Sequence, residues 1–193
     1  MDNYFPSILN DAIGPVMRGA SSSHVAAAYR IGRLGRDYMG LDHKGGNLSR
    51  VLIEYDPNGS LEPTHDSQGS DMGLFTGLMG WDITDDRMVD ARKHLEANGT
   101  DVQIAITDYG AIHPNTYKLT LTSDTESCCI LAISIGGGIV EIIAIDDIKP
   151  PSLAITTRPL SGTTIPPLIN ILKNFPASIA FTCITDYRGA SCK

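Results

Sequence analysis

Hydrophobic residues recur at three- and four-residue intervals near the start of the chain, which is the spacing of one face of an amphipathic helix. They are Val25, Ala28, Ile31, Leu34 and Tyr38. We therefore predict a helix over 25–38, with one of the preceding serines as its N-cap and that hydroxyl accepting a backbone N–H. Gly32 and Gly35 would each cost about 1 kcal/mol inside a helix, so they predict close packing against another element.

Similar patterns predict the other elements. A short helix is expected over 72–79, and a longer one over 84–98 that begins at Thr84 or Asp85 and ends at Asn98-Gly99. Runs rich in β-branched residues predict strands over 50–55, 101–107, 116–122, 130–135 and 139–145. The last two runs lack strict alternation with polar residues, which is typical of strands covered on both faces.

Two prolines after Lys149 mark the best internal boundary. Beyond it, the pattern predicts a strand over 152–157, a helix over 164–174 and a strand over 178–185. We therefore predict an α+β fold in two parts. Residues 1–148 are expected to form a mixed, mostly antiparallel sheet with helices packed on it, and residues 152–193 a short βαβ tail.

Composition narrows the possible classes of protein. With 193 residues, 42% of them hydrophobic, the chain can form one domain or one domain with a small appendage. A formal charge of −7 disfavours nucleic acid and anionic membranes as partners. The chain shows no apolar run long enough to span a bilayer and no signal peptide, so we expect a soluble, cytoplasmic protein. The four cysteines lack the spacing of ligand pairs, so we expect buried or bystander thiols in a reducing compartment and no self-contained metal site.

A serine-rich segment stands at the start of the first predicted helix. Ser21, Ser22 and Ser23 are followed directly by His24. Free N–H groups and the positive end of the helix dipole favour an anion such as a substrate carboxylate, and the hydroxyls add donors. His24 would add a proton donor or acceptor. An ordinary serine cap beside a surface histidine is the alternative interpretation.

Two further polar segments flank predicted elements. The loop over 64–71 contains His65, Gln68 and Asp71, and functional side chains are often placed on such loops. A solvated loop with Asp71 as helix cap is the alternative. The segment 113–116 precedes a strand, and its proline biases His113 to an extended conformation. An interior histidine satisfied by the backbone is the competing interpretation.

A triple glycine, Gly136, Gly137 and Gly138, follows Ser134-Ile135. It lacks the GxGxxG pattern and the P-loop lysine and runs into another strand, so nucleotide binding is not expected. Close approach of the backbone to a ligand or a neighbouring chain, or a tight bend, fits such a run better. The residues alone thus indicate an α+β domain with a candidate small-anion site.

Taken in order, these segments are similar to those of one known family. Residues 11–36, in which Ile13-Gly14-Pro15-Val16-Met17 precedes the serines, resemble the opening of the β subunit of iron–sulfur-dependent L-serine dehydratase. The family reads IGPVM-x-GPSSSHTAG there, so Ala20 replaces a proline and Val25 a threonine. Residues 59–71 are similar to its GSFAxTxKGHGTD, and 113–116 and 134–138 match its HPNT and SIGGG.

The resemblance implies one subunit of a two-chain lyase that works without pyridoxal phosphate. Such enzymes eliminate water from L-serine to give aminoacrylate, which hydrolyses to pyruvate and ammonia. A 4Fe–4S cluster, held by cysteines of the partner α subunit, acts as Lewis acid on the substrate hydroxyl. The β chain resembles an allosteric-substrate-binding domain and is expected to form a wall of the active site at the interface. Residues 152–193 resemble the first half of the ACT module that usually ends it.

One departure from the family pattern affects the expected chemistry. The histidine of KGHGTD, to which the family's catalysis is assigned, falls on Gln68. Glutamine can hold a hydrogen bond but cannot exchange a proton near neutral pH. His65 could take the role, although three extended residues span about 10 Å. A different substrate, or loss of catalysis, are the alternatives.

Two hypotheses follow for the function. The first is a catalytic-complex subunit acting on L-serine or a related β-substituted amino acid, with His24, Gln68 and Asp71 as the candidate catalytic positions. The substrate-binding candidates are Ser21, Ser22, Ser23, His65, His113, Asn115, Thr116, Gly136, Gly137 and Gly138. No metal ligand is expected in this chain. The second hypothesis is a non-catalytic, amino-acid-binding regulatory or scaffolding subunit.

Overall fold

The structure is a computed structural model that describes residues 17–41, 47–146 and 153–155. Several sequence predictions fall elsewhere and are not tested by it. The helix over 164–174, the strand over 178–185 and the boundary after Lys149 lie outside the described residues, as do Cys183 and Cys192. The division into two domains and the ACT-like tail therefore stay predictions.

The described residues form a six-stranded sheet with the strand order β2-β1-β3-β4-β5-β6. The strands are β1 (Leu48–Tyr55), β2 (Asp101–Ile106), β3 (Thr116–Ser123), β4 (Ser127–Gly136), β5 (Ile139–Ile145) and β6 (Leu153–Ile155). The β1–β2 pair is parallel and every other pair is antiparallel. A mixed, mostly antiparallel sheet in an α+β fold is thus confirmed.

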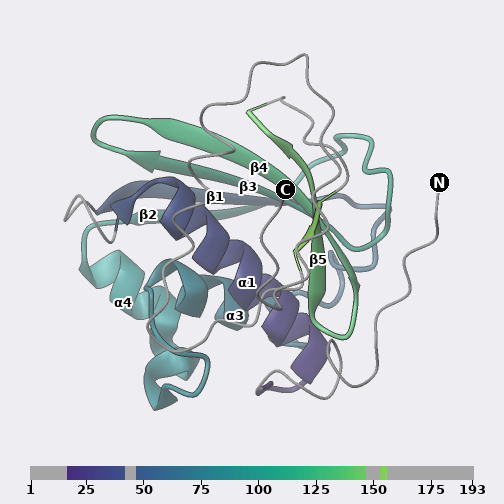
Figure 1. The fold of residues 1–193 in the computed structure, drawn as a ribbon, viewed down its shortest axis with the longest axis horizontal. Helices are drawn as coiled ribbons and strands as arrows, with labels where there is room; N and C mark the ends of the chain where they lie inside the picture. The colour runs from purple at the N-terminus through teal and green to yellow at the C-terminus, as the bar shows by residue number, and fades with distance from the viewer. Residues whose placement is uncertain (1–16, 42–46, 147–152, 156–193) are drawn as a thin grey trace, which may run out of the picture.

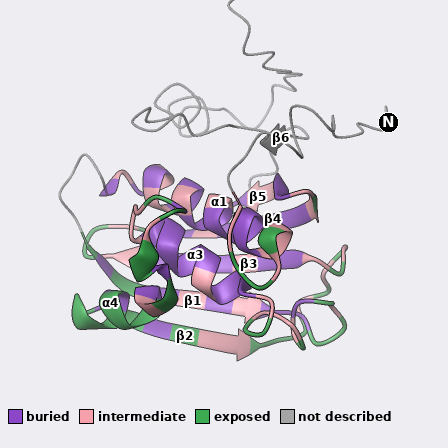
Figure 2. Cartoon of the chain, turned by 90° about the horizontal axis from the view of Figure 1, so that it is seen from below, coloured by how far each residue is buried: buried purple, intermediate pink, exposed green. Residues whose placement is uncertain are grey.

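Helices cover one side of this sheet. They are α1 (Ser22–Tyr38), α3 (Ser70–Leu78), the 3₁₀-helix η2 (Asp86–Asp90) and α4 (Ala91–Ala97). Figure 1 shows α1, α3 and α4 on the same side, and Figure 2 looks at the sheet from that side. In chain order, α3, η2 and α4 come between the parallel strands β1 and β2 and form the crossover that a parallel pair requires.

The single helix predicted over 84–98 is only partly correct. Asp85 is the N-cap, as expected, and its side chain accepts a hydrogen bond from the backbone N–H of Arg87 at 2.9 Å. The first turn is 3₁₀, and the α-helix begins only at Ala91, after Asp90 departs from helical dihedrals at φ −114° and ψ 16°. The predicted stop is confirmed, because Asn98 is the C-cap and Gly99 has a φ of +89°.

Glycines bring α1 and α3 into close contact, which confirms the packing predicted from Gly32. A Cβ on Gly32 would lie 2.2 Å from the carbonyl oxygen of Leu74. On the facing helix, a Cβ on Gly77 would lie 2.2 Å from the carbonyl oxygen of Tyr29. Only hydrogen fits at such distances, so these glycines fix how α3 sits against α1. The start of each helix is thereby placed relative to the other.

The core lies between the sheet and these helices. Along β1, Val51, Ile53 and Tyr55 alternate with more exposed residues and are 0% exposed, so they face the helices. Figure 2 shows α3 buried along nearly its whole length, whereas exposed residues gather on α4 and the loops. Tyr55 is the last residue of its strand. It brings a hydroxyl to the end of the core where the loops with the sequence motifs meet.

Candidate active site

The start of α1 is held against the loop that follows β1. Ser21 is the N-cap residue, with an extended φ of −121°, but its side chain makes no capping hydrogen bond. The prediction of a serine hydroxyl that accepts a backbone N–H is therefore wrong. The Ser21 hydroxyl instead pairs with Nδ1 of His24 at 2.7 Å, and the Ser21 N–H donates to the carbonyl of Gln68 at 3.2 Å. Two motif segments that are far apart in sequence thus touch.

Residues 61–69 form a series of hydrogen-bonded turns between β1 and α3. Leu61 is 1% exposed and anchors the segment in the core. Its carbonyl accepts the N–H of His65 at 2.7 Å, and the carbonyl of Thr64 accepts the N–H of Gln68 at 2.9 Å. The predicted polar loop is in the expected place, and these bonds give its side chains defined positions.

Asp71 is not a helix cap, contrary to one interpretation of the sequence. The N-cap of α3 is Gly69, in the left-handed region with a φ of +81°. Asp71 lies in the first turn and is 8% exposed. One carboxylate oxygen accepts the Tyr55 hydroxyl at 2.8 Å, and the other lies 2.6 Å from Nδ1 of His65. The carboxylate therefore positions a histidine from the preceding turns.

Two tyrosines that the sequence analysis did not select complete this cluster. The Tyr55 ring stacks on the His65 ring, with centroids 4.6 Å apart, and meets Tyr117 edge-on at 5.9 Å. The Tyr117 hydroxyl lies 3.0 Å from the Ser70 hydroxyl. Burial raises the pKa of Tyr117 to about 12, and burial followed by the charge of Asp71 raises the pKa of Tyr55 well above its usual value. Both tyrosines stay protonated at neutral pH.

Asn115 joins three segments at the same end of the sheet. Its side-chain amide donates to the carbonyl of Ser134 at 3.3 Å, and its side-chain oxygen accepts the Ser60 hydroxyl. Its backbone N–H donates to Nδ1 of His113 at 3.1 Å, and the Thr116 hydroxyl donates to the His113 carbonyl at 2.6 Å. His113 is half-buried and satisfied by the backbone at one nitrogen, which matches the competing interpretation in part.

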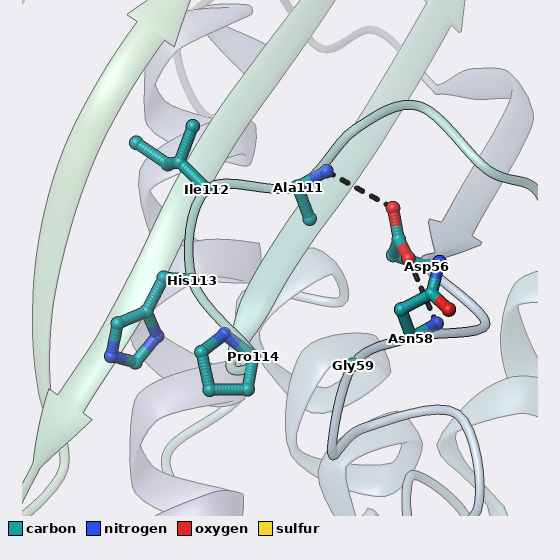
Figure 3. Close-up of a pocket in the computed structure, with 7 residues that line it drawn as sticks. All are labelled: Asp56, Asn58, Gly59, Ala111, Ile112, His113 and Pro114. Atoms are coloured by element: carbon teal, nitrogen blue, oxygen red, sulfur yellow. Dashed lines mark hydrogen bonds between the residues drawn. The ribbon is translucent and has the colours of Figure 1, made fainter.

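A small open pocket of about 150 Å³ lies beside His113 (Figure 3). Its lining consists of Asp56, Asn58, Gly59, Ala111, Ile112, His113 and Pro114. Asp56 accepts the backbone N–H groups of Ala111 at 3.0 Å and Asn58 at 2.9 Å, which lowers the pKa of its carboxyl. The Asp56 carboxylate is thus occupied by backbone N–H groups. Figure 3 shows the side chains of Ile112 and His113 pointing away from Asp56.

The triple glycine forms a tight β-hairpin between β4 and β5, which confirms the tight bend predicted as one alternative. Gly136, Gly137 and Gly138 have φ values of +101°, +59° and +77°, which only glycine adopts readily. The carbonyl of Gly138 accepts a hydrogen bond from the Arg30 guanidinium, and a Cβ on Gly138 would lie 2.9 Å from that of Ala26. The hairpin therefore packs on the first half of α1 (Figure 1).

Hydrogen bonds thus join the motif segments in series at one end of the sheet. Ser21 contacts Gln68, and His65 in the same turns contacts Asp71. Ser60, at the start of those turns, contacts Asn115, which also contacts β4. Among the residues that the structure describes, no hydrogen bond or ion pair joins His24 to His65, or His113 to either. The candidate residues form neighbouring clusters.

The chain is similar to a probable L-serine dehydratase β chain of Bacillus subtilis (strain 168). The two are 33% identical over 175 residues, which is 88% of this chain and 76% of that protein. The chain belongs to the L-serine dehydratase β-chain family. It is also 28% identical over 140 residues to the L-serine dehydratase β chain of Peptoniphilus asaccharolyticus, across 72% of this chain and 60% of that protein. No protein-family model matches the chain.

Membership of this family raises the question of an iron–sulfur cluster. Cys128 and Cys129 are neighbours on β4, so their side chains point to opposite faces of the sheet. Across residues 17–41, 47–146 and 153–155, no group of three or more histidine, cysteine or acidic residues is arranged to hold a metal ion. The described part of the chain therefore supplies no ligand set that fits a cluster. Within the same residues, no helix is long and apolar enough to cross a membrane.

Proposed function

We propose that this chain is the β subunit of a two-chain dehydratase that converts L-serine, or a related β-substituted amino acid, to a 2-oxo acid and ammonia without pyridoxal phosphate. The observation that carries the proposal is the match to the Bacillus subtilis β chain over 88% of this chain. The convergence of the motif segments on one end of the sheet supports it. The partner would be a cysteine-bearing α subunit in the cytoplasm, with the active site between the two chains.

The start of α1 is our candidate for binding the substrate carboxylate. Its free N–H groups favour an anion, and Ser22 and Ser23 would add hydroxyl donors there. The bond from Ser21 to Nδ1 of His24 fixes the imidazole and leaves its Nε2 for a ligand. His24 would accordingly hold the carboxylate or take part in proton transfer.

The neighbouring clusters would shape the rest of the site. Gln68 would occupy the position of the family's histidine and offer its amide to the substrate. Asp71 would orient its neighbours, and Asn115 would keep His113 and Thr116 in place. The glycine hairpin at 136–138 would form part of the wall, because it packs on α1 close to the helix start.

We assign the 4Fe–4S cluster to the α subunit, where it would supply a Lewis acid for the substrate hydroxyl. The expected result is that this chain alone, after anaerobic reconstitution with iron and sulfide, shows no iron–sulfur absorbance above a protein-free control. The co-purified complex treated in the same way should show it. A stoichiometric cluster on the isolated chain would contradict the assignment.

The proposed function is tested by anaerobic co-expression with a cysteine-bearing α subunit. Pyruvate and ammonia would be measured with L-serine, and the corresponding 2-oxo acids with L-threonine and L-cysteine. Turnover should require both chains, and His24→Ala should lose nearly all of it while the complex still assembles. Each chain assayed alone is the control. Near-normal turnover in His24→Ala would remove His24 from the site.

Gln68 favours one alternative, a non-catalytic subunit that binds an amino acid and regulates or supports an enzyme. Its amide cannot exchange a proton as the family's histidine can. A complex that assembles with its cluster, binds L-serine and turns over none of the amino acids would support this alternative and contradict the lyase proposal.

A further inference from the structure

The site contains a histidine, His65, that is held both by a carboxylate and by an aromatic ring. His65 lies three residues before Gln68 in the same hydrogen-bonded turns. Its Nδ1 is 2.6 Å from a carboxylate oxygen of Asp71, and its ring is stacked on Tyr55. The other oxygen of Asp71 accepts the Tyr55 hydroxyl at 2.8 Å. Both the position and the plane of the imidazole are therefore fixed.

This arrangement also determines which nitrogen of His65 carries its proton. The Asp71 carboxylate accepts hydrogen bonds, and Tyr55, whose pKa is raised by burial, remains a donor. Nδ1 of His65 must therefore donate to Asp71, and the neutral ring then has its lone pair on Nε2. No partner for Nε2 occurs among the described residues. An imidazole held by a carboxylate in this tautomer is the usual form of a histidine general base.

The surroundings of His65 suit a group that meets a substrate. Its side chain is 20% exposed, so it is held by packing yet still accessible. The carbonyl of Gln68, in the same turns, accepts the N–H of Ser21 at the start of α1, where the proposed carboxylate site lies. Asp71 is 8% exposed, so its charge acts on His65 with little screening by water.

We propose that His65 is the residue that takes the α-proton of the substrate at this site, with Asp71 and Tyr55 as positioning residues; this rests on the proposed function. Nε2 takes the α-proton of the amino acid, and the electrons of the Cα–H bond form the Cα–Cβ double bond as the bond from Cβ to the hydroxyl breaks. The proton on Nε2 passes to the departing hydroxide. Aminoacrylate and water result, and His65 is neutral again.

The test uses the two-chain complex and a variant that separates structure from chemistry. The asparagine in His65→Asn can keep an N–H donor near Asp71, but it lacks the basic imidazole nitrogen that would accept the proton. We expect a kcat for L-serine roughly 10²- to 10⁴-fold below wild type, with KM changed only a few-fold. His94→Asn is the matched control, because His94 is exposed on α4 and lies outside the motif segments; its kcat should equal that of wild type.

A second variant guards against a purely structural effect. His65→Ala leaves space beside Tyr55, and added imidazole should restore part of its kcat while leaving wild type and His94→Asn unchanged. Co-purification with the α subunit verifies assembly of each variant. Wild-type kcat in His65→Asn, or assembled variants that lose activity without rescue by imidazole, would overturn the role of His65 and leave the proposed function standing. A wild-type complex inert to every amino acid would instead overturn the proposed function, and this inference with it.

Discussion

At the scale of single residues, the Asp71 carboxylate is the centre of the site. It is buried in the first turn of α3, and a buried carboxylate is stable only when its oxygens are hydrogen-bonded. Tyr55 and His65 provide one bond each, from a strand end and from a turn. The same two bonds that stabilise the charge therefore also hold the imidazole, so stability and the proposed chemistry depend on the same atoms.

Removing the Tyr55 hydroxyl should show how far the stability of the fold depends on its hydrogen bond to Asp71. We expect Tyr55→Phe to lower the free energy of unfolding by about 1–3 kcal/mol, because a buried carboxylate oxygen loses its donor. Urea unfolding at pH 7 measures the change. A double-mutant cycle with Asp71→Asn should show strong coupling between the two positions. Strictly additive effects would mean that the bond contributes nothing of its own.

Asn115 has a comparable role in joining the loops. In Asn115→Ala, we expect faster hydrogen exchange at the backbone N–H groups of Ser60 and Ser134, which donate to carbonyls of Pro114 and Asn115. The variant loses the side-chain hydrogen bonds of Asn115 to Ser60 and Ser134, whereas the backbone groups that accept from these two amides are still present. Asn98→Ala, on the exposed end of α4, is the control and should leave both amides unchanged. Equal exchange in the two variants would contradict the role of the Asn115 side chain.

The sequence selects candidate residues but does not show the contacts between them. His65, Asp71 and Asn115 could be selected because polar side chains in loops beside apolar elements are common in functional sites. Tyr55 was missed since it ends a hydrophobic strand and matched the pattern of a core residue. Because Tyr55 stands at the end of its strand, its hydroxyl can reach the edge of the core, and this position could have marked it as a candidate. The capping bond predicted for one of the serines does not form at Ser21, because its hydroxyl pairs with His24, and that pairing depends on side-chain geometry.

At the scale of elements, hydrophobic periodicity predicts regular helices and strands correctly but misses a break inside a helix. The helix over 25–38 and the five strands before residue 146 are confirmed within a few residues. The helix over 84–98 is interrupted at Asp90, whose φ of −114° and ψ of 16° lie outside the helical region, a local departure that the periodicity of the sequence does not reveal. The pairing of β1 with β2 could not be deduced from either strand alone, since it depends on the crossover through α3 and α4.

The contact between α1 and α3 gives a prediction at this scale. Gly32→Ala should destabilise the fold by about 1–3 kcal/mol, although alanine favours a helix, because the new Cβ meets the rigid backbone of Leu74. Gly35→Ala, in the same helix, is the matched comparison. Its Cβ would lie 2.6 Å from Cδ1 of Leu121, a side-chain end that can move. Urea unfolding should rank Gly32→Ala as clearly less stable, and the reverse order would contradict the close backbone contact.

At the scale of the whole molecule, the tertiary fold determines where the candidate residues lie. The parallel strands β1 and β2 end, and the antiparallel strands β3 and β5 begin, at one end of the sheet. The glycine contacts bring the starts of α1 and α3 to that end as well. Motifs spread over more than a hundred residues thus meet there. The opposite end carries none of the candidate residues.

The buried tyrosines make the stability of the whole molecule sensitive to alkaline pH. Tyr117 has a pKa of about 12 in the folded chain against 10.0 when exposed, so the folded state binds more protons between these values and its stability falls as pH rises through them. The contribution of Tyr117 is fully present below pH 10 and amounts to about 3 kcal/mol by order of magnitude. Urea unfolding of wild type and Tyr117→Phe between pH 8 and about 11.5 measures it.

The variant isolates Tyr117 from the other causes of alkaline unfolding. Loss of lysine charge and the net charge of −7 destabilise both proteins alike, and so do the raised pKa values of Tyr55 and Tyr109. Tyr117→Phe starts lower at pH 8, because the Ser70 hydroxyl loses its partner. The difference between the two proteins should then shrink as pH rises above 10. Parallel curves over the whole range would mean that Tyr117 ionises as it does in the unfolded chain, and the buried end of the sheet would then be open to water.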